Sequence, residues 1–289
     1  MKLEPGAHRT DLRRSDIALS MANVHAAVTP RQQVIEEDFV VSPGVPWTVE
    51  TDDATSNRIA KFSSEAGLLA AHYEGLVDIT HRIVDPADVV AEAPSELPVS
   101  SLRFLYPSRY CPSDAISQKA WDLFGHLPRG YEQVRAVRDW VRDNIKFKIG
   151  TSHSGTTAVD TLRDGCGVCR DFAHTFIAYC RALNYPSRFC TGVDYGADPA
   201  LGPPDFHAYA EVQMGGHWYL FDATGISPIT GLIRIGTGRD AADAAVASIF
   251  GGASCTSMRV DCTLGEGQQF TPIGRKQLRR SGVTLAPAE

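Results

Sequence analysis

The sequence predicts an α+β fold in which a β-rich N-terminal domain, residues 1–92, precedes a second domain, residues 93–289. Three observations predict this. Short strand-like runs fill most of the first 92 residues, helical periodicity begins after about residue 100, and strand-like runs return after residue 186. Helices followed by antiparallel strands are typical of the α+β class.

The first domain is predicted from short apolar runs that clusters of Pro, Gly, Asp and Ser separate, as in a small sandwich or curled sheet. The runs are Phe39–Val41, Trp47–Glu50, Arg58–Phe62, Leu68–Tyr73 and Val77–Val84. The next segment, Asp85–Ser101, contains three prolines among Ala, Glu and Ser, and we expect it to be the linker between the domains.

The second domain is expected to begin with three helices, because apolar residues recur at helical spacing. The helices are predicted over Ala115–Leu123, Tyr131–Ile145 and Val168–Leu183. Strands are then predicted over Ser187–Tyr195, Phe206–Met214 and His217–Ala223. The tail is expected to add a short helix over Arg239–Phe250 and a strand over Thr256–Leu264.

Composition excludes several functional classes. The net charge of −6 gives no reason to expect a nucleic-acid partner or binding to an anionic membrane surface. No apolar run approaches the roughly 18–20 residues that span a bilayer, and no apolar stretch follows the basic residues of the N-terminus, so we expect neither a membrane span nor a secretory signal. The seven cysteines are odd in number and show no small-scaffold spacing, which favours reduced thiols and a cytoplasmic location.

Cys169 is the candidate nucleophile. It stands at the start of the predicted helix Val168–Leu183, directly after a glycine-bearing turn over Asp164–Gly167. The free N–H groups and the dipole at a helix N-terminus favour thiolate over thiol. Taken alone the position is weak, because cysteine is among the residue types most often buried in a core.

A predicted hairpin supplies a base and a carboxylate. Gly215-Gly216 suits a two-residue turn between the strands 206–214 and 217–223, so that residue 214 pairs with residue 217. In this register His207 and Asp222 share one face as diagonal neighbours on adjacent strands, roughly 7–8 Å apart. The carboxylate can then fix the imidazole tautomer and leave the other ring nitrogen for a thiol. The alternative for His207 is a satisfied histidine in a sheet, and His174, five residues into the helix, points elsewhere.

Four ordered blocks together resemble the bacterial transglutaminase-like family of cysteine proteases. The blocks are GVCRDFAH at 167–174, CRALNYPSR at 180–188, HAYAEV at 207–212 and HWYLFDAT at 217–224. The resemblance implies a papain-like core in which Cys169 is the nucleophile, His207 the base and Asp222 the acid, with a β-rich domain in front of it. Tyr209, where many relatives have Trp, is then expected in the substrate-binding acyl pocket.

The resemblance implies acyl transfer on a peptide or protein substrate through a thioester, either as a protease or amidase or as a transglutaminase. The rival interpretation is a catalytically idle interaction module with the same fold. No second Cys pair accompanies Cys166-x-x-Cys169 and no EF-hand loop is present, so we expect no metal and no cofactor. Cys166 is either an inert neighbour or a partner for a 166–169 disulfide, which a sharp turn at Gly165 and Gly167 would permit.

Overall fold

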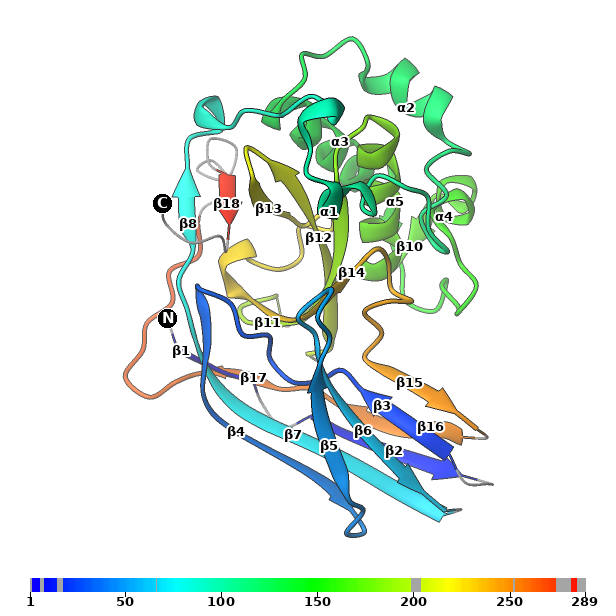
Figure 1. Cartoon of the computed structure of the whole chain (residues 1–289), viewed down its shortest axis with the longest axis vertical. Helices are drawn as coiled ribbons and strands as arrows, with labels where there is room; N and C mark the ends of the chain where they lie inside the picture. The colour runs from blue at the N-terminus through cyan, green and yellow to red at the C-terminus, as the bar shows by residue number, and fades with distance from the viewer. Residues whose placement is uncertain are drawn as a thin grey trace.

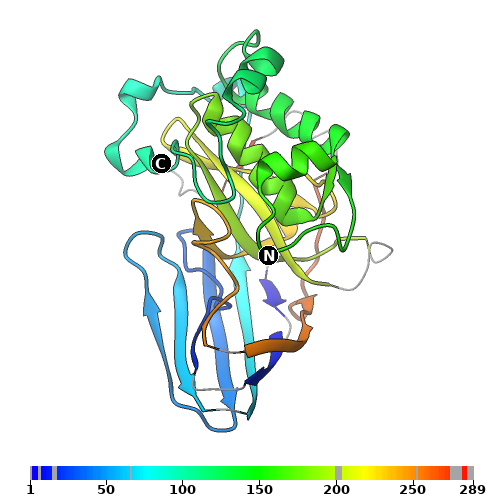
Figure 2. The ribbon, with the colours of Figure 1, turned by 90° about the vertical axis from the view of Figure 1, so that its right-hand side faces the viewer.

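The computed structural model describes residues 2–5, 8–14, 18–65, 67–198, 204–251, 253–273 and 282–284. Its elements form an α+β arrangement in three parts. A central sheet has helices on one side and a unit of mostly N-terminal strands on the other (Figures 1 and 2). The predicted fold class is therefore confirmed.

The N-terminal β unit consists of a six-stranded and a four-stranded sheet. The six-stranded sheet contains β1 (Lys2–Pro5), β2 (His8–Arg14), β4 (Gln32–Ser42), β7 (Gly67–Ile79), β16 (Ala253–Arg259) and β17 (Cys262–Leu264). The four-stranded sheet contains β3 (Ala18–Ala22), β5 (Trp47–Thr51), β6 (Arg58–Ser64) and β15 (Ala247–Phe250).

Four of the five predicted N-terminal strands are confirmed, while the predicted strand Val77–Val84 is divided between the end of β7 and β8 (Arg82–Val84), which belongs to the central sheet. Alternation explains the strands of the unit. Along β7 the side chains of Leu69, Tyr73, Val77 and Ile79 are buried, because every second residue of a strand faces the same side. They form one apolar cluster with Phe39 of β4. Leu220 and Ile233 belong to the same cluster, so this core lies between the unit and the central sheet.

The segment after residue 238 differs from the expectation in two ways. The predicted helix Arg239–Phe250 is wrong: residues 239–246 form turns and β15 follows. Tertiary hydrogen bonds occupy the backbone there, since Thr191 Oγ1 donates to the Ala244 carbonyl and the Asn23 N–H donates to the Val246 carbonyl. Alanine-rich sequence favours a helix only weakly against such contacts.

The tail returns to the first part of the chain. The predicted strand near residues 256–264 exists as β16 and β17, but these strands pair with β2 and β1, and β15 pairs with β3. Strands β15, β16 and β17 therefore complete the N-terminal sheets (orange in Figure 2), although the sequence suggested that their residues belong with residues 93–289.

The helices cover one face of the central sheet. The three predicted helices are confirmed and two shorter ones accompany them: α1 (Val99–Leu102), α2 (Ser117–Phe124), α3 (Tyr131–Asn144), α4 (Ala158–Asp164) and α5 (Cys169–Ala182). Helix α5 is central, because its Phe172, Phe176 and Ile177 are buried against the other helices and against β12.

The central sheet has the strand order β14-β11-β12-β13-β18-β8. Its strands are β8 (Arg82–Val84), β11 (Ser187–Asp194), β12 (Phe206–Met214), β13 (His217–Phe221), β14 (Leu232–Gly238) and β18 (Gly282–Thr284). The predicted hairpin register is confirmed: Met214 pairs with His217, while Gly215 and Gly216 form the turn with φ of 57° and 74°.

Two side-chain amides bind the edge of the central sheet to the N-terminal unit. Asn57 donates to the Thr237 carbonyl at 2.8 Å and accepts from the Thr237 N–H at 2.7 Å. Gln32 does the same with Arg234, at 2.8 Å in each direction. These amides bond backbone groups of β14 that a further strand would otherwise pair, so this edge of the sheet is protected from pairing with another chain.

The segment predicted as a linker is held against the second domain. It contains two short 3₁₀ turns, Pro86–Asp88 and Pro94–Glu96, and its Glu92 carboxylate accepts from the N–H groups of Gly215 and Gly216 at 2.9 and 2.6 Å. The linker thus braces the turn of the β12–β13 hairpin.

Candidate active site

Cys169 is the first residue of α5, as the sequence predicted, and it is partly accessible. The turn before it is fixed by Asp171, whose Oδ2 accepts from the Val168 N–H at 2.9 Å and whose Oδ1 accepts from Ser152 Oγ at 2.9 Å. Gly167 fits only because it lacks a side chain, since a Cβ there would lie 2.7 Å from the Cβ of Asp171. The Asp171 carboxylate therefore positions the nucleophile's backbone.

Two short elements deliver the chain to this turn. Helix α4 begins with a capping box in which the Asp160 carboxylate accepts from the Thr157 N–H at 3.0 Å, and it ends at Gly165 with φ of 64°. The chain then forms β10 (Cys166–Gly167), which pairs in parallel with β9 (Lys146–Phe147). Cys169 follows this pair after a single residue.

His207 and Asp222 come together as the hairpin register predicts. His207 Nε2 lies 3.2 Å from Asp222 Oδ2, and both side chains are only 4% exposed. The other carboxylate oxygen, Oδ1, accepts from the N–H and the hydroxyl of Thr224 at 2.8 and 2.7 Å. Thr224 therefore fixes the orientation of the carboxylate that in turn orients the imidazole.

Cys169 completes the group. Its thiol lies close enough to the His207 imidazole to contribute to the raised pKa of that ring, and its Sγ lies 4.0 Å from the carbonyl oxygen of Phe206. Since Nε2 faces Asp222, the imidazole places its two nitrogens between a carboxylate and a thiol. The structure thus brings together the three side chains that the sequence singled out.

The charges in this group reinforce one another. Burial acts to lower the pKa of His207, but Asp222 and then Cys169 outweigh it and raise that pKa well above its usual value. Burial acts to raise the pKa of Asp222, but His207 and Thr224 hold it below the usual range. The pair therefore favours an imidazolium beside a carboxylate.

Tyr209 does not lie where the sequence analysis expected it. Its side chain is 1% exposed and packs with Cys190 and Leu220 in the apolar cluster that the central sheet shares with the N-terminal unit. It faces this core because strand residues two apart share a face, and the sheet face is covered. Tyr209 therefore does not form a wall of a substrate pocket.

Cys166 is half-buried, and all seven cysteines are free thiols. The expected sharp turn between Cys166 and Cys169 is absent: Gly167 lies in β10, and Val168 is extended with φ −107° and ψ 179°. Three extended steps separate the Cα atoms by roughly 10 Å, beyond the roughly 7 Å limit for a disulfide. A 166–169 bridge would have to break the β9–β10 pairing.

His174 is buried elsewhere, as predicted. Its ring stacks on Tyr110, contacts Phe189, and accepts from the Ala241 N–H at 3.1 Å. The sequence analysis missed the roles of Asp171 and Thr224. Asp171 is the third residue of α5, the position at which a capping box carries its acidic residue. This position was the signal that could have identified it.

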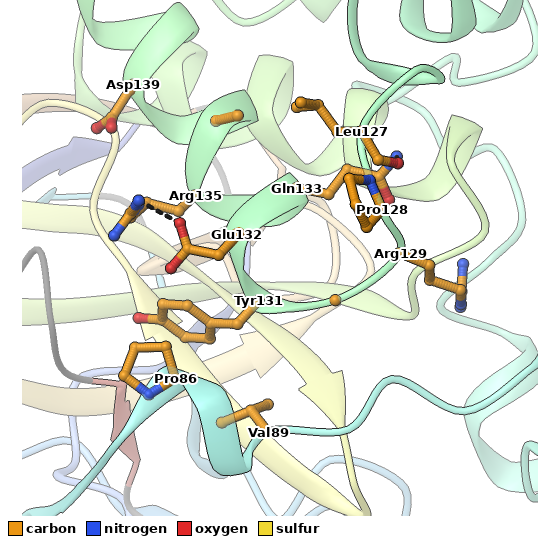
Figure 3. Close-up of a pocket in the computed structure, with 12 residues that line it drawn as sticks. Pro86, Val89, Leu127, Pro128, Arg129, Tyr131, Glu132, Gln133, Arg135 and Asp139 are labelled. Atoms are coloured by element: carbon orange, nitrogen blue, oxygen red, sulfur yellow. Dashed lines mark hydrogen bonds and ion pairs between the residues drawn. The ribbon is translucent and has the colours of Figure 1, made fainter.

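One cavity of about 550 Å³ borders the group at Asp222 and Thr224, and Arg138 and Arg142 of α3 lie on its other side. A second cavity, of about 510 Å³, lies between Pro86 and the first turns of α3 and contains none of the three residues (Figure 3). This first cavity adjoins the site through Asp222 and Thr224, and its lining does not include Cys169 or His207.

Within the described ranges, no group of three or more His, Cys, Asp or Glu side chains is placed to hold a metal ion. None of the helices in that part of the chain has the length and apolar character needed to cross a membrane.

Comparisons with known proteins agree with this geometry. Residues 120–223 match the Transglutaminase-like superfamily, and the match contains Cys169, His207 and Asp222. A solved structure from Cytophaga hutchinsonii, provisionally named a cysteine protease, superposes with a TM-score of 0.92 at 36% identity, over 98% of this chain and 97% of that one. The chain belongs to the transglutaminase-like superfamily.

An uncharacterized protein of Mycobacterium leprae (strain TN) is 31% identical over 141 residues, which are 47% of this chain and 50% of that protein. The matched part thus spans about half the length of this curated relative. The full-length likeness to the Cytophaga structure therefore carries the family assignment.

Proposed function

We propose that the protein is a cysteine acyl-transfer enzyme acting on peptide or carboxamide bonds of a peptide or protein substrate. Cys169 is the nucleophile, His207 the general base and acid, and Asp222 the carboxylate that orients His207. The observation that carries the proposal is the placement of the Cys169 thiol, at the N-terminus of α5, beside the hydrogen-bonded His207–Asp222 pair of the β12–β13 hairpin. The family membership supports it.

The reaction proceeds by proton transfers between Cys169, His207 and the substrate. His207 takes the Sγ proton, and the thiolate attacks the substrate carbonyl, whose oxygen gains the negative charge. The N–H of Cys169 at the helix terminus is a donor for this oxyanion. As the carbonyl reforms, His207 gives its proton to the leaving amine or ammonia and a thioester remains. Water, or a second amine, then attacks the thioester with His207 again as base.

The raised pKa of His207 suits this cycle. An imidazolium held by Asp222 stabilises a neighbouring thiolate before substrate arrives and can then serve as the acid for the leaving group. The burial of both His207 and Asp222 strengthens the pair, because water does not screen it. Seven free thiols suit a reducing compartment, so we place the enzyme in the cytoplasm.

An activated acyl ester such as 4-nitrophenyl acetate tests the proposal without knowledge of the substrate. Intact and peptide mass spectrometry should find the acyl group on Cys169 in the wild type. The adduct should be absent from the Cys169→Ala protein and should persist in a Cys166→Ala protein, which loses a half-buried thiol three residues away. Uniform slow acylation of several cysteines would instead favour the idle interaction module.

A further inference from the structure

The cavity that carries a further inference lies between the N-terminal unit and the central sheet. It has a volume of about 430 Å³, and segments 27–30 and 55–57 face Arg188, Trp218 and Arg234 across it. It shares no residue with the cavity beside Asp222. We call it the interdomain cavity.

Its wall contains an unbalanced set of buried charges. The Glu211 carboxylate is fully buried, and Arg188 donates to its Oε2 from Nε at 2.7 Å and from Nη2 at 2.6 Å. Arg234 binds the other oxygen, Oε1. Within the part of the chain that the structure describes, Glu211 is the only carboxylate paired with either arginine. Two permanent cations thus share one anion, and an unpaired buried charge is costly.

Both guanidinium groups line the cavity, and Arg234 keeps an unsatisfied donor. Arg234 is 7% exposed, and its Nε has no hydrogen-bond partner. The side chain of Arg188 is 17% exposed, and the Trp218 ring covers its guanidinium at 4.2 Å, which fixes the plane of the fork. A planar guanidinium offers parallel N–H donors that match the oxygens of a carboxylate or a phosphate.

The nearby side chain of His81 adds no charge to this cluster. Burial, with a smaller contribution from the charge of Arg234, lowers the pKa of His81 to about 4. His81 therefore stays neutral near pH 7 and does not add to the charge. It also brings no counter-charge to the site, so the excess of one positive charge stands.

The cavity at α3 shows what a balanced wall looks like (Figure 3). There Glu132 pairs with Arg135, and the Arg129 guanidinium donates to the carbonyls of Glu92, Leu183 and Asn184. Arg129 and Arg135 each have acceptors of their own there, whereas Arg188 and Arg234 share the single carboxylate of Glu211.

We propose that the interdomain cavity binds a small oxyanion, a phosphate or a carboxylate, which completes the Arg188–Glu211–Arg234 cluster. Arg188 and Arg234 hold the anion, and Trp218 fixes Arg188 from behind. The site is separate from the acyl-transfer site, so the Cys169→Ala protein should bind the anion as the wild type does.

Calorimetric titration and thermal unfolding of the full chain test this proposal. The probes are inorganic phosphate and acetate, each compared with chloride at equal ionic strength, and the two arms separate the phosphate class from the carboxylate class. Arg188→Gln leaves a neutral Arg234–Glu211 pair and should weaken binding at least about tenfold. Glu211→Gln raises the charge from one to two positive charges and should tighten it.

The matched control is Arg163→Gln, which removes an arginine that is 65% exposed on α4 and should leave anion binding unchanged. If Glu211→Gln does not fold without added anion, folding rescued by phosphate or acetate but not by chloride supports the site. Equal binding in the wild type and in Arg188→Gln overturns the proposal. The proposal is also overturned if phosphate and acetate raise the thermal stability of the wild type no more than chloride does.

Discussion

Replacing Asp171 with alanine should loosen the backbone that presents Cys169. The wild-type carboxylate is 1% exposed; its two shorter hydrogen bonds come from the Val168 N–H and from Ser152 Oγ, and a third, of 3.4 Å, comes from Nη2 of Arg170. A hydrogen bond to a charged acceptor contributes about 1.5 kcal/mol or more, so Asp171→Ala should cost about 3 kcal/mol of unfolding free energy. Urea unfolding measures this loss.

The functional consequence is separate from the loss of stability. With Val168 released, the Cys169 thiol should no longer be held against His207, and its alkylation by iodoacetamide near neutral pH should slow at least about tenfold. The exposed thiol of Cys255 gives the reference rate in the same sample. Asp171→Asn keeps one acceptor oxygen for the Val168 N–H and should restore part of the rate.

The control is the corresponding position of the neighbouring capping box. Asp160→Ala removes the same kind of cap from α4, at a residue whose side chain is 32% exposed. It should cost about 1 kcal/mol and leave Cys169 alkylation unchanged. A folded Asp171→Ala protein that alkylates Cys169 at the wild-type rate would refute the positioning role.

Three other predictions concern the charges and thiols. Asp222→Asn should remove the raised pKa of His207, so that Cys169 alkylation at pH 6–7 slows while that of Cys255 does not; an unchanged pH profile would contradict the orienting role. His25 is buried, and burial lowers its pKa to about 4. The stability that depends on neutral His25 is therefore present above about pH 6.5 and is lost as the pH falls toward 4. In urea unfolding, His25→Phe should remove up to about 3 kcal/mol of this pH dependence. The extended backbone keeps Cys166 away from Cys169. In Cys166→Ser, Cys169 should therefore lose its labelling after peroxide and recover it with reductant as the wild type does. Loss of recovery in the variant alone would reverse this conclusion.

The pairing of His207 with Asp222 could be predicted because a local feature determines it. Two glycines accept the positive φ angles of a two-residue turn, the turn fixes the register, and strand periodicity then places both side chains on one face. The position of Cys169 follows in the same way from helix periodicity. Neither inference needs a contact between distant segments beyond the hairpin itself.

The features that the sequence did not predict depend on distant partners or short segments. Helix α4 has seven residues, too few for a clear period, and the Thr157–Asp160 capping box was its main signal. Residues 239–246 have helix-compatible composition, but their backbone groups bond Thr191 and Asn23, which lie far away in the sequence. The pairing of residues 253–264 with the first strands also leaves no local mark.

The N-terminal unit covers part of the β12 face to which His207 belongs. His207, Tyr209 and Glu211 alternate along one face of β12, and the unit covers Tyr209 and contributes to the apolar cluster around it. Glu211 is sealed beneath Arg188 and Arg234, while Gln32 and Asn57 bind the edge strand β14 from the same side. Only the His207 end of the strand meets the thiol. The middle of this strand face is therefore buried beside the site, and the His207–Asp222 pair, at 4% exposure, interacts in an environment that water screens little.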